Sequence, residues 1–196
     1  MRVRKAGKDD VEAVAALLYE SSPAIYDRFA GNRGRAMRIL VEAFGEPGNV
    51  ASEEVVRLAE ADGRPVAAMA AFPIAEGPAR ARAFTRLGLR RVPPWLWART
   101  LRLYTAGTRA PRDRSLYVDA LATDPAYRRR GAATALLDEA EREATRLGLR
   151  AVALDTTLDN SVARSFYARA GFDEVAYRAA SRSLPGFVAL VKPVDR

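Results

Sequence analysis

One strand–helix–strand segment in the second half of the chain constrains the fold most. Residues 115–123 form an apolar-rich run typical of a buried strand, which ends at Asp124-Pro125. In residues 132–147 apolar side chains recur at helical spacing, and Gly148 is suited to end that helix. A second short apolar run follows at residues 151–155. A strand, a helix and a strand in this order predict two parallel strands joined by a right-handed crossover, and therefore a mixed α/β fold.

The remaining sequence adds strands and helices around this unit. We expect strands at residues 1–5, 53–61, 64–72, 172–180 and 187–191, and helices at 33–44, at 160–170 and after Asp10, the last with an interruption at Ser21-Ser22-Pro23. Asp62-Gly63 stands between two alternating apolar runs and indicates a hairpin. For 196 residues, a single domain spanning 1–196 is the simplest organisation.

The amino-acid composition excludes several classes of chemistry. Without cysteine the chain has no disulfide and no thiolate metal site, and without histidine it lacks the commonest general base and zinc ligand. Catalysis must then use carboxylates, tyrosine, hydroxyl groups, lysine, arginine or the backbone, and we expect no metal. No cleavable leader pattern follows the basic first five residues, and no apolar run is long enough to cross a bilayer. We therefore expect a soluble, cytoplasmic protein with no membrane partner.

The turn after the strand at 115–123 has the features of an anion site. Backbone N–H groups at a strand-to-helix turn point into one concavity, and the positive end of the helix attracts an anion. The small side chains here leave those amides accessible, and the arginines add positive charge at the rim, so we predict a diphosphate-containing ligand. The same residues also suit an ordinary turn with three solvated arginines. The predicted cradle comprises Arg128, Arg129, Arg130, Gly131, Ala132, Ala133 and Thr134.

Two sequence blocks together resemble the GNAT superfamily of N-acetyltransferases. The run 128–133 is similar to its Arg/Gln-x-x-Gly-x-Gly/Ala motif, and the block 160–172 is similar to its Asn…Tyr…Gly-Phe segment. The resemblance is specific over about residues 115–175, is compatible with 1–75, and leaves 76–114 unexplained. It implies a mostly antiparallel central sheet of about six to seven strands, with a splayed parallel pair and flanking helices. Residues 76–114 would then be an arginine-rich helical insertion in that domain.

The same resemblance implies a function and a cosubstrate. The chain would move an acetyl group from acetyl-coenzyme A to a primary amine of a small molecule or peptide. The pantetheine arm would lie between the strands at 116–123 and 151–155, against the backbone of Leu121, Ala122 and Thr123. Asn160 would cap the next helix and touch that arm. An alternative is a non-catalytic module or sensor that binds coenzyme A or acyl-coenzyme A. Homodimers are common among relatives, and a nucleic-acid partner is not expected.

Tyr167 and Asp119 are the candidate catalytic residues. By resemblance, Tyr167 would be the general acid toward the departing thiolate, a role that suits a phenol protonated at neutral pH; it could also be a core aromatic. Strand alternation would place Tyr117, Asp119 and Leu121 on one face, toward the acceptor site, with Asp119 as general base. A buried salt bridge from Asp119 to an arginine is an equal alternative. Weaker candidates for the base are Glu53, Glu54 and Asp155.

Residues 77–112 hold nine arginines and no acidic residue. This segment could form a wall of the acceptor site that selects an acidic substrate, or an amphipathic element that faces a membrane or nucleic acid. The simplest interpretation, which we rank first, is a pair of helices with core aromatics and with arginines that are solvated or paired with surface acids.

Overall fold

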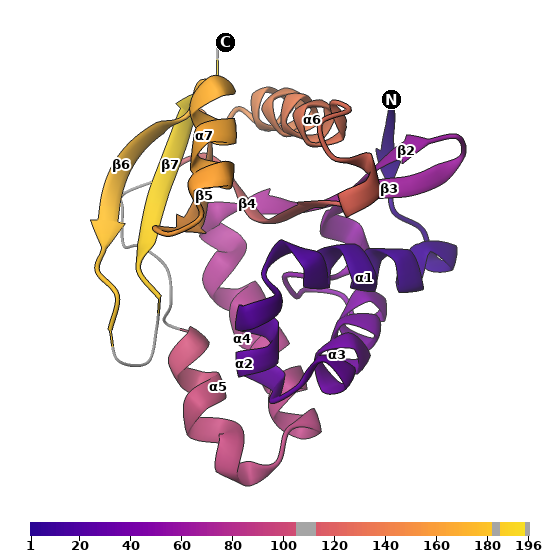
Figure 1. The fold of residues 1–196 in the computed structure, drawn as a ribbon, viewed down its shortest axis with the longest axis vertical. Coiled ribbons are helices and arrows are strands. Elements are labelled where there is room, and N and C mark those ends of the chain that lie inside the picture. Colours follow the sequence, from indigo (N-terminus) through magenta and orange to yellow (C-terminus); the bar gives the residue numbers. More distant parts are fainter. Residues whose placement is uncertain (105–112, 182–184, 195–196) are drawn as a thin grey trace.

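A seven-stranded sheet forms the centre of the computed structural model, which describes residues 1–104, 113–181 and 185–194 (Figure 1). The strand order is β1-β2-β3-β4-β5-β7-β6, and every neighbouring pair is antiparallel except the parallel pair β4 and β5. This confirms the expected mixed sheet. The strands are β1 (Arg2–Lys5), β2 (Val56–Ala61), β3 (Arg64–Pro73), β4 (Ser115–Thr123), β5 (Ala151–Thr157), β6 (Asp173–Arg178) and β7 (Phe187–Pro193).

Helices cover both faces of the sheet. The helices are α1 (Val11–Ser21), α2 (Pro23–Ala30), α3 (Arg33–Gly45), α4 (Gly77–Arg91), α5 (Trp97–Tyr104), α6 (Ala132–Arg146) and α7 (Ser161–Arg169). One buried cluster, here called the N-terminal core, joins one sheet face to α1–α4. The other, the C-terminal core, joins the opposite face to α6 and α7 (Figure 1). Helix α2 was not expected, because Pro23 suggested an interruption; it is instead the first residue of that helix, where proline is favoured.

A β-bulge in β4 changes which residues share a face. Ala70 of β3 pairs with Ala120, whereas Ala71 pairs with Val118, so Asp119 is an extra residue without a partner on β3. Tyr117 consequently packs on the N-terminal core and Leu121 on the C-terminal core. The prediction that these two residues lie on one face with Asp119 was therefore wrong, because simple alternation assumes a strand without a bulge.

Strands β4 and β5 separate halfway along their length. Their ladder runs from Ser115 with Ala151 to Val118 with Leu154 and then stops. Beyond that point β4 stays paired with β3 up to Thr123, and β5 stays paired with β7 up to residue 157. The gap thus opens between two strands that are each held on their other side. This is the splayed parallel pair that the resemblance implied.

The arginine-rich insertion forms a helical arm, α4 and α5, that packs on α2. The rings of Phe29 and Phe84 lie 5.2 Å apart, and the Thr100 hydroxyl donates a 2.8 Å hydrogen bond to the Phe29 carbonyl. Arg80 and Arg91 form ion pairs with glutamates. These contacts agree with the helical-pair interpretation.

Other features of the insertion depart from that interpretation. Phe84 is buried, as expected, but Trp95 and Trp97 are exposed rather than core residues. Residues 105–112 and the side chain of Tyr104 lie outside the described part of the chain.

Candidate active site

The turn from β4 to α6 is held in an unusual backbone conformation. The Asp124 carboxylate accepts a 2.8 Å hydrogen bond from the Ala126 N–H, and the Asp124 carbonyl accepts one of 2.8 Å from Tyr127. Arg129 and Gly131 then adopt the left-handed region, with φ of 61° and 84°. This region costs a non-glycine residue about 1 kcal/mol. Its occurrence at Arg129 indicates that neighbouring contacts impose the shape of the turn.

The backbone amides of this turn have no partners in the described structure. None of the N–H groups from Arg128 to Thr134 donates a hydrogen bond to a described residue, and the first bond of α6 runs from Ala135 to the Gly131 carbonyl, at 2.9 Å. A Cβ placed on Gly131 would meet nothing within 4 Å, so the concave side is open. Free amides at the start of a helix form an anion site.

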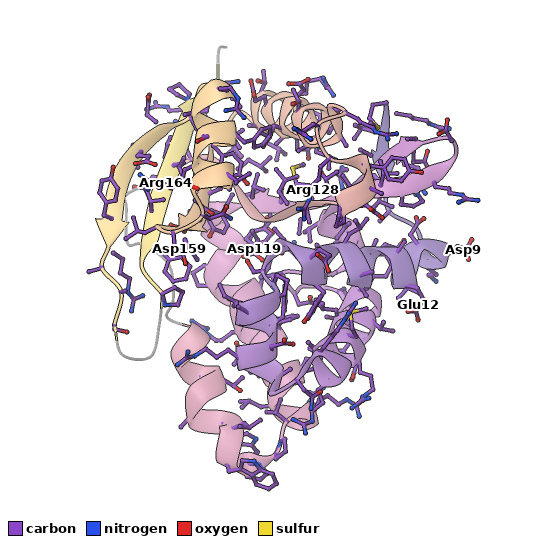
Figure 2. All side chains as sticks on the ribbon, in the orientation of Figure 1. Asp9, Glu12, Asp119, Arg128, Asp159 and Arg164 are labelled. Carbon is purple, nitrogen blue, oxygen red and sulfur yellow. The ribbon has the colours of Figure 1, made fainter. Side chains whose placement is uncertain are left out.

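Three exposed arginines surround these amides. The Arg128 Nε lies 3.4 Å from the Thr123 carbonyl (Figure 2). The Arg130 guanidinium stands 5.3 Å above the Tyr127 ring. None of Arg128, Arg129 and Arg130 forms an ion pair with a carboxylate of a described residue. Their charge is therefore uncompensated, and together with the amides it suits a diphosphate.

Tyr167 lies in the C-terminal core together with Val118 and Leu154, the last residues that β4 and β5 pair. Its side chain is 8% exposed, and its ring packs against Phe166 and Phe172 at 5.2 and 5.7 Å. Burial raises the pKa of its phenol to about 12, so the hydroxyl keeps its proton at neutral pH. In the described structure that hydroxyl makes no hydrogen bond, an unfavourable state for a buried polar group and one that an incoming ligand would relieve.

Asp119 occupies the bulge of β4, in the middle of the molecule (Figure 2). By surface area Asp119 is exposed, yet enough protein atoms surround its carboxyl to desolvate it. This desolvation, together with the negative charge of Asp155, raises the pKa of Asp119 to about 7. No described arginine pairs with it, so the salt-bridge alternative is not what the structure contains.

Two tyrosines accompany the aspartates. Tyr117 donates a 3.0 Å hydrogen bond from its hydroxyl to the Asp155 carboxylate. Tyr26, on α2, packs against the same core as Tyr117, and its pKa is raised by burial and by the charge of Asp119. Our sequence reasoning missed Tyr26, because only the packing of α2 brings it there. Asp155 was named from the sequence as a weaker candidate base, and it proves to be the first residue of β5 beyond the ladder with β4.

The other candidate bases lie elsewhere. Glu53 and Glu54 belong to a short 3-10 turn before β2, and Arg80 holds the Glu54 carboxylate at 2.6 Å. That carboxylate lines a cavity of about 280 Å³ beside α6, together with Leu116 near the start of β4 and with Leu147. The apolar spacing of residues 132–147 would bury Leu147 with the rest of the helix face, but Leu147 is 41% exposed there. The cavity lies at the opposite end of β4 from the cradle.

The sequence profile of the acetyltransferase (GNAT) family matches residues 24–172. The chain belongs to this family. A comparison with curated proteins finds no match. Members of the GNAT family transfer acetyl groups from acetyl-coenzyme A, so acetyl transfer is the reaction class of the chain.

Solved structures with the same fold span the whole chain. An acetyltransferase is 20% identical, with a TM-score of 0.71 over 100% of both chains. The N-acetyltransferase from Staphylococcus aureus Mu50 is 16% identical, with a TM-score of 0.72 over 97% of this chain and 100% of its own. PaiA N-acetyltransferase from Thermoplasma acidophilum, solved in complex with coenzyme A, is 16% identical, with a TM-score of 0.55 over 98% of each chain. These likenesses show the GNAT fold.

The residues present suit coenzyme A, the cosubstrate of GNAT enzymes. The cradle amides and arginines fit its diphosphate, and the gap beside Leu121, Ala122 and Thr123 leaves a strand edge unpaired, where an amide-bearing pantetheine arm could pair. Asn160 caps α7 as predicted, accepting a 3.1 Å hydrogen bond from Ala163. Its side-chain amide nitrogen has no partner among the described residues.

Two further findings concern metals and membranes. Within residues 1–104, 113–181 and 185–194, no group of three or more acidic side chains could hold a metal ion. No helix in that part of the GNAT chain is long and apolar enough to span a bilayer.

Gly131 gives a direct test of the cradle. We expect Gly131→Ala to strain the left-handed turn by about 1 kcal/mol and to weaken coenzyme A binding about fivefold in calorimetry. Gly148→Ala is the matched control, since Gly148 also has positive φ and open space, at the other end of α6. It should lose similar stability without losing affinity. Equal affinities of both variants for coenzyme A would contradict the cradle.

Proposed function

We propose that the chain is an N-acetyltransferase that moves the acetyl group of acetyl-coenzyme A directly to a primary amine. The observation that carries this proposal is the set of unpartnered amides from Arg128 to Thr134, which stands at the same end of β4 as the gap toward β5. Acetyl-coenzyme A supplies the activated acetyl thioester. Family membership supports acetyl transfer, and the amine acceptor is our inference.

Binding would be divided between two parts of the site. The amides of Gly131, Ala132, Ala133 and Thr134, with the arginines at 128–130, would hold the diphosphate. The exposed strand edge of Leu121, Ala122 and Thr123 and the Asn160 side chain would hold the pantetheine arm. This division fixes the thioester end near the bulge at Asp119, because the strand edge leads there from the cradle.

Asp119 would act as the general base. An amine is protonated at neutral pH, and it becomes a nucleophile only after it loses that proton. A carboxylate whose pKa is about 7 can accept the proton near neutral pH, directly or through water, whereas an ordinary carboxylate is a weaker base. Asp155, held by the Tyr117 hydroxyl, supports this role by keeping the pKa of Asp119 high.

Tyr167 would act as the general acid. Its buried phenol keeps its proton and has no described partner, so it is available to give that proton to the departing sulfur. The acceptor amine would approach from the side of the N-terminal core, against which Tyr26 of α2 packs. We propose small-molecule or peptide amines as acceptors, while homodimer formation and a cytoplasmic location stay predictions.

The pH dependence tests Asp119. We expect kcat/KM to rise with pH through an inflection near 7 as Asp119 loses its proton. Asp119→Asn should abolish this rise, the acidic limb of the profile, and should lower kcat by about 10²-fold or more.

The raised pKa also means that ionised Asp119 destabilises the fold above neutral pH. Asp119→Asn should therefore raise the free energy of unfolding at pH 8 but not at pH 3, where both states of the wild-type carboxyl are protonated.

The surface variant Asp138→Asn is the control for this experiment, because Asp138 is exposed on α6. It should change neither the pH profile nor the stability difference. An unchanged acidic limb in Asp119→Asn would remove Asp119 from the mechanism.

Tyr167→Phe tests the general acid. Because the hydroxyl has no described partner, its removal should leave the melting temperature unchanged or slightly higher, while turnover falls about 10²-fold. Tyr177→Phe, which removes an exposed hydroxyl bonded to Glu174, should keep full turnover. Release of free thiol from acetyl-coenzyme A across a panel of amines measures the turnover.

The outcome also separates the two candidate functions. Wild-type turnover in Tyr167→Phe would refute the acid role. Tight coenzyme A binding with no thiol release from any amine would favour the sensor alternative.

A further inference from the structure

The end of the helical arm carries an exposed apolar patch. Trp95, Trp97 and Leu101 are 80%, 45% and 48% exposed. Trp97 and Leu101 are four residues apart on α5 and so share one face of the helix, and the indole N–H of Trp97 donates a 3.3 Å hydrogen bond to the Val92 carbonyl. Large exposed apolar side chains that gather at one place mark an interaction site more often than scattered ones do.

A row of unpaired arginines lies on the helix that leads to this patch. Arg82, Arg86 and Arg90 follow each other at four-residue spacing on α4, and all three are exposed. Unlike Arg80 and Arg91, they form no ion pair with a described residue. Like charges at this spacing repel each other, and α4 itself has no acid to offset them; of the three, Arg90 is near enough to Glu42 of α3 to lower the pKa of that carboxyl. Arg90 is five residues before Trp95 in the chain, and we call the apolar patch and this row together the Trp–Arg surface.

The Trp–Arg surface belongs to an arm that packs on α2, and it is distant from the cradle. The arm is fixed to α2 by the contacts of Phe29 with Phe84 and Thr100. In Figure 1 α5 lies at the lower end of the long axis, whereas α6 and α7 lie at the upper end. A surface that projects from the end of a molecule can approach a flat partner without obstruction.

We propose that the Trp–Arg surface docks the protein on an anionic lipid membrane. Tryptophan favours the membrane–water interface, and each arginine near an anionic leaflet adds attraction. A nucleic acid could also use tryptophan and arginine, but it gains nothing from exposed Leu101, whereas a membrane buries that side chain favourably. Such peripheral docking needs no membrane-spanning helix, and it departs from our sequence-based expectation of no membrane partner. It does not depend on the proposed function.

The tryptophans provide the readout. The chain has two tryptophans, and both belong to the Trp–Arg surface, so tryptophan fluorescence, excited at a wavelength that tyrosine does not absorb, reports on it alone. Vesicles of phosphatidylcholine with added phosphatidylserine should shift the emission of the full chain to shorter wavelength and protect it from acrylamide quenching. Vesicles of phosphatidylcholine alone should not, and added salt should reverse the shift.

Charge removal tests the arginines. The combined variant Arg82→Gln, Arg86→Gln and Arg90→Gln should bind anionic vesicles roughly 100-fold more weakly in sedimentation. A control variant should bind as the wild type does, although it loses the same net charge. It replaces by glutamine three exposed arginines on other elements or loops, namely Arg2, Arg64 and Arg150.

Several results would overturn the proposal. No shift with anionic vesicles, or equal shifts with neutral ones, would refute a charge-dependent membrane contact. An equal loss of affinity for anionic vesicles in the control variant would mean that net charge alone, and not the Trp–Arg surface, determines binding. A shift produced by a single-stranded RNA oligonucleotide but not by vesicles would assign the surface to nucleic acid, and a shift that grows with protein concentration without vesicles would assign it to self-association.

Discussion

The parallel pairing of β4 and β5 ends after Val118 and Leu154, and the proposed site is built around that break. A gap inside a sheet leaves backbone groups without ladder partners, which is unfavourable when they are buried. It persists here because β3 and β7 hold the two strands from outside. A ligand with its own amide groups can complete the ladder. The fold thus leaves backbone hydrogen-bonding groups unpaired at the place where the cosubstrate of this family would bind.

The unpaired part of β4 runs from the bulge at Asp119 to the turn after Thr123, and each of its ends carries a group that could take part in the reaction. At one end the extra residue, Asp119, carries a carboxyl whose pKa is raised to about 7 by burial and by Asp155. At the other end Arg129 and Gly131 take left-handed backbone conformations that leave the amides at the start of α6 free. The proposed base and the proposed anion site therefore belong to one short piece of backbone. Their separation is set by the strand and does not depend on flexible loops.

Sequence patterns predicted the features that local residues determine. The hairpin at Asp62-Gly63 has positive φ at both residues, as its type of turn requires, and the small residues predicted at 131–133 do begin a helix. The cradle itself stays a prediction. The bulge at Asp119 was not predictable, because a single extra residue leaves the apolar pattern nearly intact. It nevertheless turns every later side chain of the strand toward the opposite face of the sheet from the one that alternation predicts. Pro23 is ambiguous alone, since proline both ends one helix and begins another. The exposure of Trp95 depends on how the arm packs.

Hydrogen–deuterium exchange with and without coenzyme A tests the central claim most directly. If the diphosphate binds to the turn before α6, the amides from Arg128 to Thr134 should exchange more slowly when coenzyme A is bound. Amides of the hairpin at Asp62-Gly63, which lie outside the proposed site, should exchange at an unchanged rate. Binding of coenzyme A with no protection of the turn, or with protection confined to another part of the chain, would contradict this account.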